Sequence, residues 1–272
     1  LSDIGAVVTK SVMSNPRAGR ATPRMAETAS GMLNAIGLQG PGIDSFLEHD
    51  LPWLHAEGAR TIVSIAGESV EEFASLARKV RQAPGVSAIE VNISCPNVKK
   101  GGMEFGNDPV MTASVVSACR KATSKPIITK LSPNQSDIKK SAQACIDSGT
   151  DGLSVINTIS GMAIDIEKKE PVLGNRAGGL SGPAIKPIAL LKVFDVFTVA
   201  QKYNVPILGQ GGISNASDAI EFILAGATTV GVGTALFFDP LVCSKINKGI
   251  TAYLEKQNLT SLDQIVGAAH IK

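Results

Sequence analysis

The feature that most constrains this chain is a repeat of short β-branched runs, each closed by a polar or glycine-rich loop and followed by an amphipathic helical stretch. This alternation is typical of βα units. Because the runs are apolar along their whole length, they indicate a parallel sheet covered on both faces. We predict strands at 4–10, 61–67, 88–94, 127–131, 152–158, 206–211 and 229–234, and helices at 70–80, 109–122, 136–148, 185–203 and 215–225.

We expect these strands to form an α/β fold, a TIM (β/α)8 barrel with parallel strands, as a single domain over residues 1–272. A chain of 272 residues is one that a single barrel commonly fills. Such a barrel needs eight strands and about seven are found. We therefore expect its first strand to be missing from this chain. The alternative is a seven-stranded or open, doubly wound sheet. Long insertions at 11–53 and 160–182 follow strand ends, where barrel enzymes elaborate their active sites.

Composition excludes several classes of protein. The formal net charge is +2 and no Lys/Arg run is interleaved with aromatic residues, so nucleic-acid binding is not expected. No apolar run reaches the roughly 18 residues of a membrane span, and no signal segment precedes the first strand. No Cys/His cluster has metal-ligand spacing. We expect a cytoplasmic protein without a metal that acts on a small molecule, with reduced thiols at Cys95, Cys119, Cys145 and Cys243.

Polar residues gather at the ends of the predicted strands. In a parallel barrel these ends meet on one face, so residues far apart in sequence line one pocket. A lysine buried there requires an anionic or electron-rich partner, such as a phosphate, a carboxylate or a reduced flavin, although a lysine at the rim of the pocket needs none. The residues concerned are Lys10, Asn92, Cys95, Lys130, Asn157 and Thr158.

The last two predicted strands end in glycine-rich loops, at 209–213 and 231–235. Glycines let backbone N–H groups approach an anion closely, and a helix that begins near Asn215 adds a favourable dipole. The pair is typical of the phosphate site of barrel enzymes. The alternative for each loop is a tight turn from strand to helix. The candidate phosphate ligands are Gly211, Gly212, Gly233 and Thr234.

Cys95 lies in a strand-end loop next to a proline, and a polar, glycine-rich stretch that could act as a lid follows it. It is a candidate nucleophile or general base. A Cys–His dyad is not expected, because the three histidines fall in a loop (His49), an apparent helix (His55) and the tail (His270). By contrast, Cys119 and Cys145 lie on apolar helix faces and read as core residues.

Four asparagines lie near the converging strand ends. An Asn side chain offers both a donor and an acceptor, which matches the alternating N–H and C=O groups of a pyrimidine ring. A single Asn is more often a turn or cap residue. The group indicates a planar ligand that carries amides, and its members are Asn34, Asn92, Asn97 and Asn157.

Together these motifs resemble the dihydroorotate dehydrogenase family. They are NAIGL at 34–38, NISCPNV at 92–98, KLSPN at 130–134, INT at 156–158 and GLSGPAIKP at 179–187, so the likeness covers almost the whole chain. It looks closest to the NAD-linked branch, because cysteine rather than serine at position 95 is similar to the cytosolic class. The resemblance implies oxidation of dihydroorotate to orotate in pyrimidine (UMP) biosynthesis.

Carried over, the resemblance implies that Cys95 removes a proton from ring carbon five while a hydride passes from ring carbon six to FMN. Lys130 would face the flavin ring and stabilise negative charge on it. The implied substrate residues are Lys10, Asn34, Ala35, Ile36, Gly37, Leu38, Asn92, Asn157 and Thr158. The implied FMN residues are Lys10, Ser11, Ser64, Asn92, Lys130, Ile156, Gly182, Gly211, Gly212, Gly233 and Thr234.

The resemblance also implies a partner: an electron-transfer subunit that carries FAD and an iron–sulfur cluster and passes electrons to NAD. A homodimer or a heterotetramer is expected by analogy. An unpartnered form that uses fumarate or another acceptor remains an alternative.

Two departures from the family pattern weaken the carry-over. Ser64 stands where the family usually has Asn, which shortens or removes one flavin contact. The family's first strand, with its flavin contact, has no counterpart here. Three alternatives stay open: a dihydropyrimidine (dihydrouracil) dehydrogenase barrel, a flavin-free phosphate-binding barrel isomerase or lyase, and a scaffold subunit that binds flavin or phosphate without catalysis.

Overall fold

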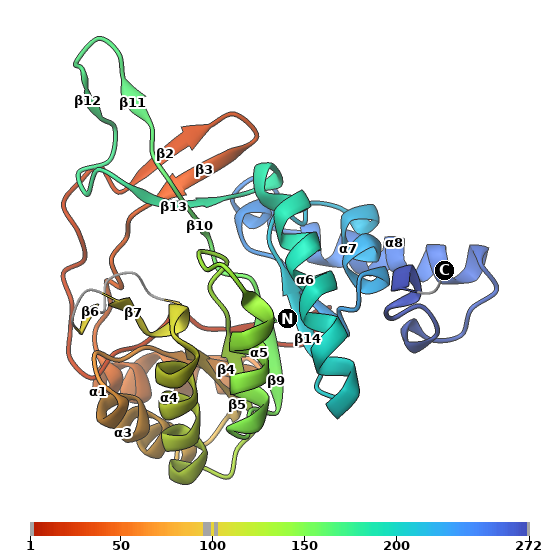
Figure 1. The fold of residues 1–272 in the computed structure, drawn as a ribbon, viewed down its shortest axis with the longest axis horizontal. Coiled ribbons are helices and arrows are strands. Elements are labelled where there is room, and N and C mark those ends of the chain that lie inside the picture. Colours follow the sequence, from red (N-terminus) through yellow and green to blue (C-terminus); the bar gives the residue numbers. More distant parts are fainter. Residues whose placement is uncertain (1–2, 95–98, 101–102, 271–272) are drawn as a thin grey trace. The chain divides into compact units, whose positions relative to one another are not determined.

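The computed structural model describes residues 3–94, 99–100 and 103–270 (Figure 1). The chain divides into two compact units. The first unit comprises residues 1–19 and 37–153, and the second unit comprises residues 20–36 and 154–272.

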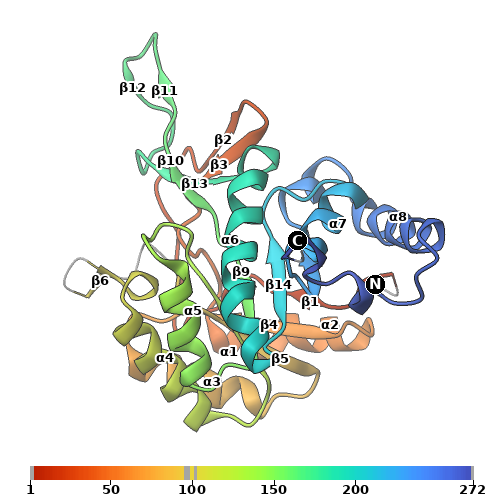
Figure 2. The same cartoon turned by 45° about the vertical axis from the view of Figure 1, so that its right-hand side comes forward.

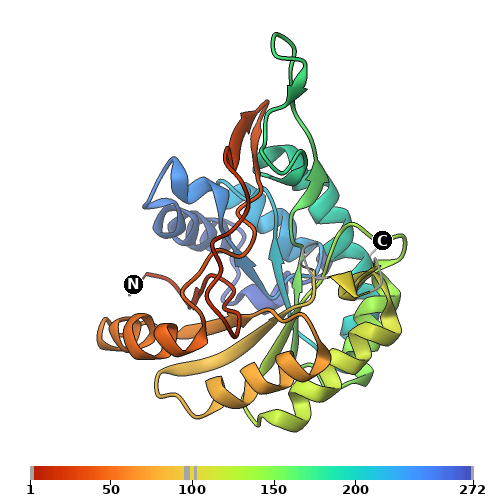
Figure 3. The same ribbon diagram turned by 90° about the vertical axis from the view of Figure 1, so that its left-hand side faces the viewer.

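The first unit is built on parallel strands that pair in the order β1, β4, β5, β8. Each is followed by a helical segment, as the sequence predicts. Figure 1 shows α3 beside α4, and Figure 3 shows the orange helix α3 along the gold strands. The strands are β1 (Val7–Val8), β4 (Thr61–Ile65), β5 (Val86–Asn92), β8 (Ile127–Lys130) and β9 (Gly152–Val155), which runs into the second unit. The helices are α1 (Ile43–Ser45), η1 (Phe46–Asp50), α2 (Leu51–Ala56), α3 (Val70–Arg81), η2 (Phe105–Asn107), α4 (Pro109–Ala122) and α5 (Ile138–Asp147).

The main helices of the first unit begin at capping side chains. Ser69 accepts a hydrogen bond from the backbone N–H of Glu72, which fixes the start of α3. Asp108 and Asp137 cap α4 and α5 in the same way. Such caps satisfy N–H groups that have no partner inside the helix. A short antiparallel pair, β6 (Lys99–Lys100) and β7 (Met103–Glu104), precedes α4.

The second unit repeats the strand–helix pattern. Strands β14 (Ile207–Gln210) and β15 (Thr229–Gly231) are parallel. The ring of His270, near the end of the chain, stacks on Phe194 of α6 with centroids 3.6 Å apart. The helices are η3 (Pro183–Ile185), α6 (Lys186–Ala200), η4 (Gln201–Tyr203), α7 (Ala216–Leu224), η5 (Thr234–Phe237), α8 (Val242–Lys256), η6 (Leu262–Gln264) and η7 (Ala268–His270).

The two long insertions meet in the second unit as one antiparallel sheet. Segments far apart in sequence pair there, since Asn34 lies opposite Gly179 in the register. Leu33 is buried beneath this sheet with Leu173. A further hairpin extends beyond the sheet (Figure 2). The sheet order is β10 (Ile159–Gly161), β13 (Gly178–Ser181), β3 (Gly31–Asn34) and β2 (Met25–Thr28), and the hairpin is β11 (Ile164–Asp165) with β12 (Glu170–Pro171).

The predicted α/β class, with parallel strands and helices of the TIM-barrel type, is confirmed. Every predicted strand is present, and each ends before the predicted last residue because the chain turns into a loop there; β5 keeps its predicted length because it begins two residues earlier. Within the described residues, β1 has a paired neighbour on one side only, β4. One placement is wrong: His49 lies in the π-helical turn η1 and not in a loop. None of the helices that the structure describes is both long and apolar enough to cross a membrane.

Candidate active site

The predicted site residues fall, as expected, at the carboxyl ends of the parallel strands. Asn92 is the last residue of β5 and Lys130 the last residue of β8. In the second unit, Gly211 and Gly212 follow β14 directly. The predicted base Cys95 and the neighbouring Asn97 lie outside the described residues.

In the first unit, a continuous chain of hydrogen bonds links three strand ends. The Nδ2 of Asn92 donates to Ser11 Oγ at 2.9 Å, and the hydroxyls of Ser11 and Ser64 are 2.8 Å apart. Ser64 Oγ donates to Glu90 Oε1 at 2.8 Å. Because a hydroxyl has one proton, Ser11 must donate to Ser64. We call this set, with Lys130, the serine–glutamate network.

Ser94 fixes the other half of the Asn92 amide. Its hydroxyl and its backbone N–H both approach Asn92 Oδ1, at 2.8 and 3.3 Å. An amide whose oxygen accepts two hydrogen bonds and whose nitrogen donates to a serine has one orientation that satisfies all partners. Asn92 therefore holds a preset orientation at the end of β5.

Glu90 is the buried charge of the network, and sequence reasoning missed it. Its exposed fraction is 2%, and Lys130 Nζ lies 3.9 Å from its Oε1. A buried carboxylate needs a cation and hydrogen-bond donors, because an isolated one is strongly destabilising. The available signal was one acidic residue inside the apolar run 88–94. The prediction of a partly buried Lys130 beside an anion holds, with a protein carboxylate as that partner.

The structure also places Lys10 and Ser64. The sequence left open whether Lys10 is buried or at the rim; it lies two residues beyond β1 and is exposed, so it is a rim lysine. Ser64 directs its hydroxyl to Glu90, and its backbone N–H donates to Thr9 Oγ1 at 3.1 Å. Its polar groups are therefore engaged within the protein.

A cavity of about 380 Å³ in the first unit is lined by three predicted site residues, Lys10, Ser11 and Leu38. Its wall is mainly apolar and includes Phe46 and Trp53. Leu38 has a left-handed backbone, with φ of 56°, and directly follows Gly37, with φ of 75°. Two successive positive φ angles turn the chain sharply into this wall.

In the second unit, predicted substrate residues gather around Gly179. Asn34 Nδ2 donates to the Gly179 carbonyl at 3.4 Å. A Cβ at position 179 would collide with the Thr158 side chain, so Thr158 lies directly against this glycine. Asn157 Oδ1 accepts the backbone N–H of Thr158 at 2.8 Å. The backbone of the segment that follows Asn34 is held by two hydrogen bonds. The N–H of Ala35 donates to the Arg24 carbonyl, and the carbonyl of Ile36 accepts from the Arg20 N–H.

The predicted phosphate loops also come together in the second unit. Gly212 has φ of 83°, and a Cβ there would lie 2.8 Å from the Gly182 carbonyl. A Cβ on Gly182 would lie 3.6 Å from Thr234 Cγ2. Ile156 donates its backbone N–H to the Gln210 carbonyl at 3.0 Å, which places it beside Gly211. These backbone segments form a tight cradle.

Gly233 differs from the other glycines. Its φ is −123°, and a Cβ there would meet no atom within 4 Å. Neither left-handed backbone nor packing against the described residues requires a glycine at this position. A group that approaches the backbone closely, as the phosphate of FMN would, is a physical reason for it. The cradle thus fits the cofactor that the sequence predicts.

The helix that follows the first glycine loop is capped by its own chain. Asn215 Oδ1 accepts the Asp218 N–H at 3.0 Å, and Asp218 accepts Lys186 Nζ at 2.8 Å. Burial acts to raise the pKa of Asp218, but hydrogen bonds from Lys186 and Ser214 outweigh it and lower that pKa. Lys186 is therefore committed to the carboxylates of Asp218 and Glu221, and the glycine amides remain as the candidate phosphate ligands.

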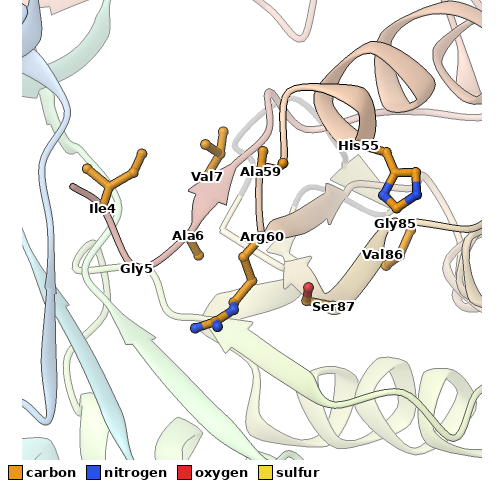
Figure 4. Close-up of a pocket in the computed structure, with 11 residues that line it drawn as sticks. Ile4, Gly5, Ala6, Val7, His55, Ala59, Arg60, Gly85, Val86 and Ser87 are labelled. Atoms are coloured by element: carbon orange, nitrogen blue, oxygen red, sulfur yellow. The ribbon is translucent and has the colours of Figure 1, made fainter. Parts of the chain in front are cut away.

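A larger cavity, of about 600 Å³, lies at the amino ends of the first unit's strands (Figure 4). Arg60 and His55 line it together with Val86. None of the predicted site residues lines it. In barrels this end serves stability and not catalysis, so the strand-end clusters are the better candidate site. Among the described residues, no group of three or more His, Cys, Asp and Glu side chains could hold a metal ion.

The cysteines of α4 and α5 are core residues, as predicted. Cys119 and Cys145 are buried, and burial raises the pKa of each thiol to about 12. Such thiols stay protonated and unreactive near neutral pH. Cys243 of α8 is partly exposed, and burial raises its pKa as well.

Parallel strands with surrounding helices, and polar side chains at the strand ends, define the class of α/β-barrel enzymes. A family model described as dihydroorotate dehydrogenase matches residues 1–254, and the chain belongs to this family. The recognition made from the sequence motifs is therefore confirmed.

The chain is similar to proteins named dihydroorotate dehydrogenase B (NAD(+)), catalytic subunit. The relative from Geotalea uraniireducens is 51% identical over 98% of this chain and 87% of its own length. The relative from Trichlorobacter lovleyi is 52% identical over the same shares. That from Desulforamulus reducens is 50% identical over 100% of this chain and 88% of its own length.

Proposed function

We propose that this chain oxidises (S)-dihydroorotate to orotate in the de novo synthesis of pyrimidines, with FMN as the hydride acceptor. The observation that carries the proposal is the polar group around Gly179, formed by the side-chain amides of Asn34 and Asn157 and the hydroxyl of Thr158. Side chains that both donate and accept suit the N–H and C=O edge of a dihydropyrimidine. The names of the relatives support the same substrate.

The substrate residues act by holding the ring. Asn92, with its orientation preset by Ser11 and Ser94, presents an amide to the ring or its carboxylate. The segment 34–38 contributes Asn34, Ala35, Ile36, Gly37 and Leu38, and Lys10 contributes a positive charge at the rim. Positioning of this kind converts binding energy into rate.

The proton of ring carbon five goes to the Cys95 side chain, which acts as the general base. A thiol has an ordinary pKa of about 8.5, so the reaction should speed up as pH rises through that of Cys95.

FMN, when bound, supplies the two-electron chemistry of the reaction. The phosphate is held by Gly211, Gly212, Gly233 and Thr234, with Gly182 and Ile156 packed near the flavin. Lys130 faces the flavin and favours negative charge on it. Ser11, Ser64 and Asn92 support this side. The function is proposed for a single FMN-binding domain over residues 1–272.

Electrons leave through a second subunit with FAD and an iron–sulfur cluster, and reach NAD. The name "catalytic subunit" of the relatives supports such a partner. The assembly is a homodimer or a heterotetramer, and it acts in the cytoplasm.

The test is an anaerobic absorption spectrum of the purified protein with FMN, recorded before and after addition of dihydroorotate. We expect the flavin band near 450 nm to bleach with dihydroorotate and to persist with dihydrouracil. Bleaching with dihydrouracil alone would move the assignment to a dihydropyrimidine dehydrogenase. A protein that binds no flavin would contradict the proposal and favour a phosphate-binding isomerase or lyase.

A further inference from the structure

Glu90 is buried at a point where a charge is costly. It occupies β5, one of the inner strands of the first unit's sheet, between Ile89 and Val91, which are fully buried. A carboxylate in such a place is retained only if its partners compensate for lost hydration. Its partners are one hydroxyl, on Ser64, and one ammonium, on Lys130. Ser64 gives Glu90 a single hydrogen bond, and Lys130 forms neither a bidentate nor a close ion pair with it. The Glu90–Lys130 pair is therefore not optimised for stability alone.

The geometry favours a role for Glu90 toward the end of β8. Asn92 lies opposite Lys130 in the parallel register, and Glu90 precedes Asn92 by two residues on the same face of β5. Lys130 Nζ is 3.9 Å from Glu90 Oε1, and the exposed fraction of the Lys130 side chain is 20%. The Lys130 ammonium is therefore held by Glu90 on one side and remains partly exposed on the other.

We propose that Glu90 is a positioning residue that holds the Lys130 ammonium at the mouth of β8 and moderates the positive charge that the flavin meets. Ser64 serves this role by donating its only hydroxyl proton to the carboxylate and so orienting Glu90 toward Lys130. This inference rests on the proposed function, because it assumes that Lys130 faces FMN.

The physical consequence is a balance of charge. A lysine alone stabilises the anionic, reduced flavin and raises its potential. A carboxylate beside that lysine offsets part of the effect, since the two charges oppose each other at the flavin. Removal of the Glu90 charge should therefore make FMN easier to reduce, whereas removal of the Lys130 charge should make it harder.

The experiment measures the midpoint potential of bound FMN in the wild type and in Glu90→Gln. The glutamine keeps an oxygen that accepts from Ser64 and loses only the charge. We expect the preference for reduced over oxidised FMN to rise about tenfold, an upward shift of about 30 mV. The matched control is Asp151→Asn, at the opposite end of β8, where the carboxylate pairs with Arg120 and accepts the Ile127 N–H. We expect no shift in the control.

A double-mutant cycle with Lys130→Gln separates positioning from general charge. If Glu90 acts through Lys130, the Glu90→Gln effect on the potential falls below about threefold in the Lys130→Gln background. In the flavin-free protein, Lys130→Gln should lower the unfolding midpoint, because it leaves a buried carboxylate without its cation, and the double variant should restore it. This readout works even if Glu90→Gln alone fails to fold.

The outcomes are distinguishable. A Glu90→Gln potential that moves no more than that of the Asp151→Asn control, with FMN bound and reduced normally, would overturn this inference and leave the proposed function standing. An unfolding cycle in which the double variant is no more stable than Lys130→Gln would overturn it as well. A wild-type protein that binds no FMN would overturn the proposed function itself.

Discussion

The two clusters of predicted site residues, the serine–glutamate network and the glycine cradle, differ in whether side chains or backbone form them. In the first unit, the serine–glutamate network consists of side chains, and each hydroxyl or amide has a defined donor and acceptor. In the second unit, the cradle of Gly182, Gly211, Gly212 and Gly233 consists of backbone, and its shape depends on the absence of side chains. The first region presents polar side chains, and the second presents a closely packed backbone surface.

The difference predicts how each region responds to mutation. A network of polar side chains can lose one group and still fold, because its strands are held by backbone hydrogen bonds and apolar packing. At Gly182, Gly211 and Gly212 the backbone cradle cannot accept a Cβ without moving the chain, whereas Gly233 has open space around it. Changes in the first unit should therefore act mainly on reaction rate, and changes in the cradle mainly on cofactor binding and stability.

The largest expected effect is on side-chain chemistry. Cys95→Ala should slow flavin reduction by dihydroorotate about a thousandfold, because the general base is lost, while FMN affinity stays unchanged. Stopped-flow reduction across pH 6 to 10 measures it, and the wild-type rate should rise with pH. Cys243→Ser on α8 is the control and should keep the wild-type rate. An unchanged rate in Cys95→Ala would remove Cys95 from the mechanism.

The next effect separates two kinds of glycine. Gly212→Ala should weaken FMN binding and also lower the free energy of unfolding by about 1–3 kcal/mol, because its φ is positive and its Cβ meets the Gly182 carbonyl. Gly233→Ala should weaken FMN binding with little effect on stability, since its Cβ meets open space. Titration with FMN and denaturant unfolding measure both. Equal stability losses in the two variants would erase the distinction between them.

A smaller effect concerns the ion pair beside the cradle. Asp218→Asn should cost about 1–3 kcal/mol of stability at pH 7, because Lys186 and Ser214 lose a buried charged acceptor. The folded pKa of Asp218 is lowered, so its stabilising contribution is present above the unfolded value of 3.8 and is lost as pH falls below it.

The control for this prediction is Glu221→Gln, which also binds Lys186 but is more exposed. It should cost less than about 1 kcal/mol. Unfolding curves at pH 7 and pH 3 decide the matter: the gap between wild type and Asp218→Asn should be smaller at pH 3, below the unfolded pKa of 3.8. A gap of the same size at both pH values would mean that packing, and not charge, is responsible.

The smallest effect is an absence of reactivity. Because burial raises the pKa of Cys119 and Cys145 to about 12, a thiol reagent at pH 8 should leave both unmodified in the folded protein. Mass spectrometry after labelling tests this, with urea-unfolded protein as the positive control.

In the unfolded chain these thiols ionise near pH 9, so the free energy of unfolding should fall as pH rises above that value. Rapid labelling of the folded protein would show that the α4–α5 core opens readily.

Local pattern predicted much of the fold. The apolar runs lie within the elements they define, so their period located the strands and helices, and the structure adds the caps at Ser69, Asp108 and Asp137 that fix the helix starts. The antiparallel sheet of the second unit was not predicted, because Asn34 pairs with Gly179 across 145 residues and such a register leaves no local signal.

The candidate site was predicted unevenly for a physical reason. Gly211 and Gly212 could be recognised from the sequence because few other residues fit a loop with positive φ angles. Glu90 and the role of Ser64 were missed, since a hydrogen bond between neighbouring strands depends on which face each side chain occupies. For Lys10 the sequence left burial and a rim position open, and the structure places it on the rim because β1 ends at Val8.

We expect the glycine cradle to bind a phosphate through its backbone, and the serine–glutamate network to set the reduction potential of the flavin ring. Comparison of FMN with riboflavin tests this most directly, because the two differ only by the phosphate. We expect FMN to bind the wild type at least about a hundredfold more tightly than riboflavin. Gly233→Ala should reduce that advantage, and Glu90→Gln should leave it unchanged. Equal affinity of the wild type for both flavins would contradict the account.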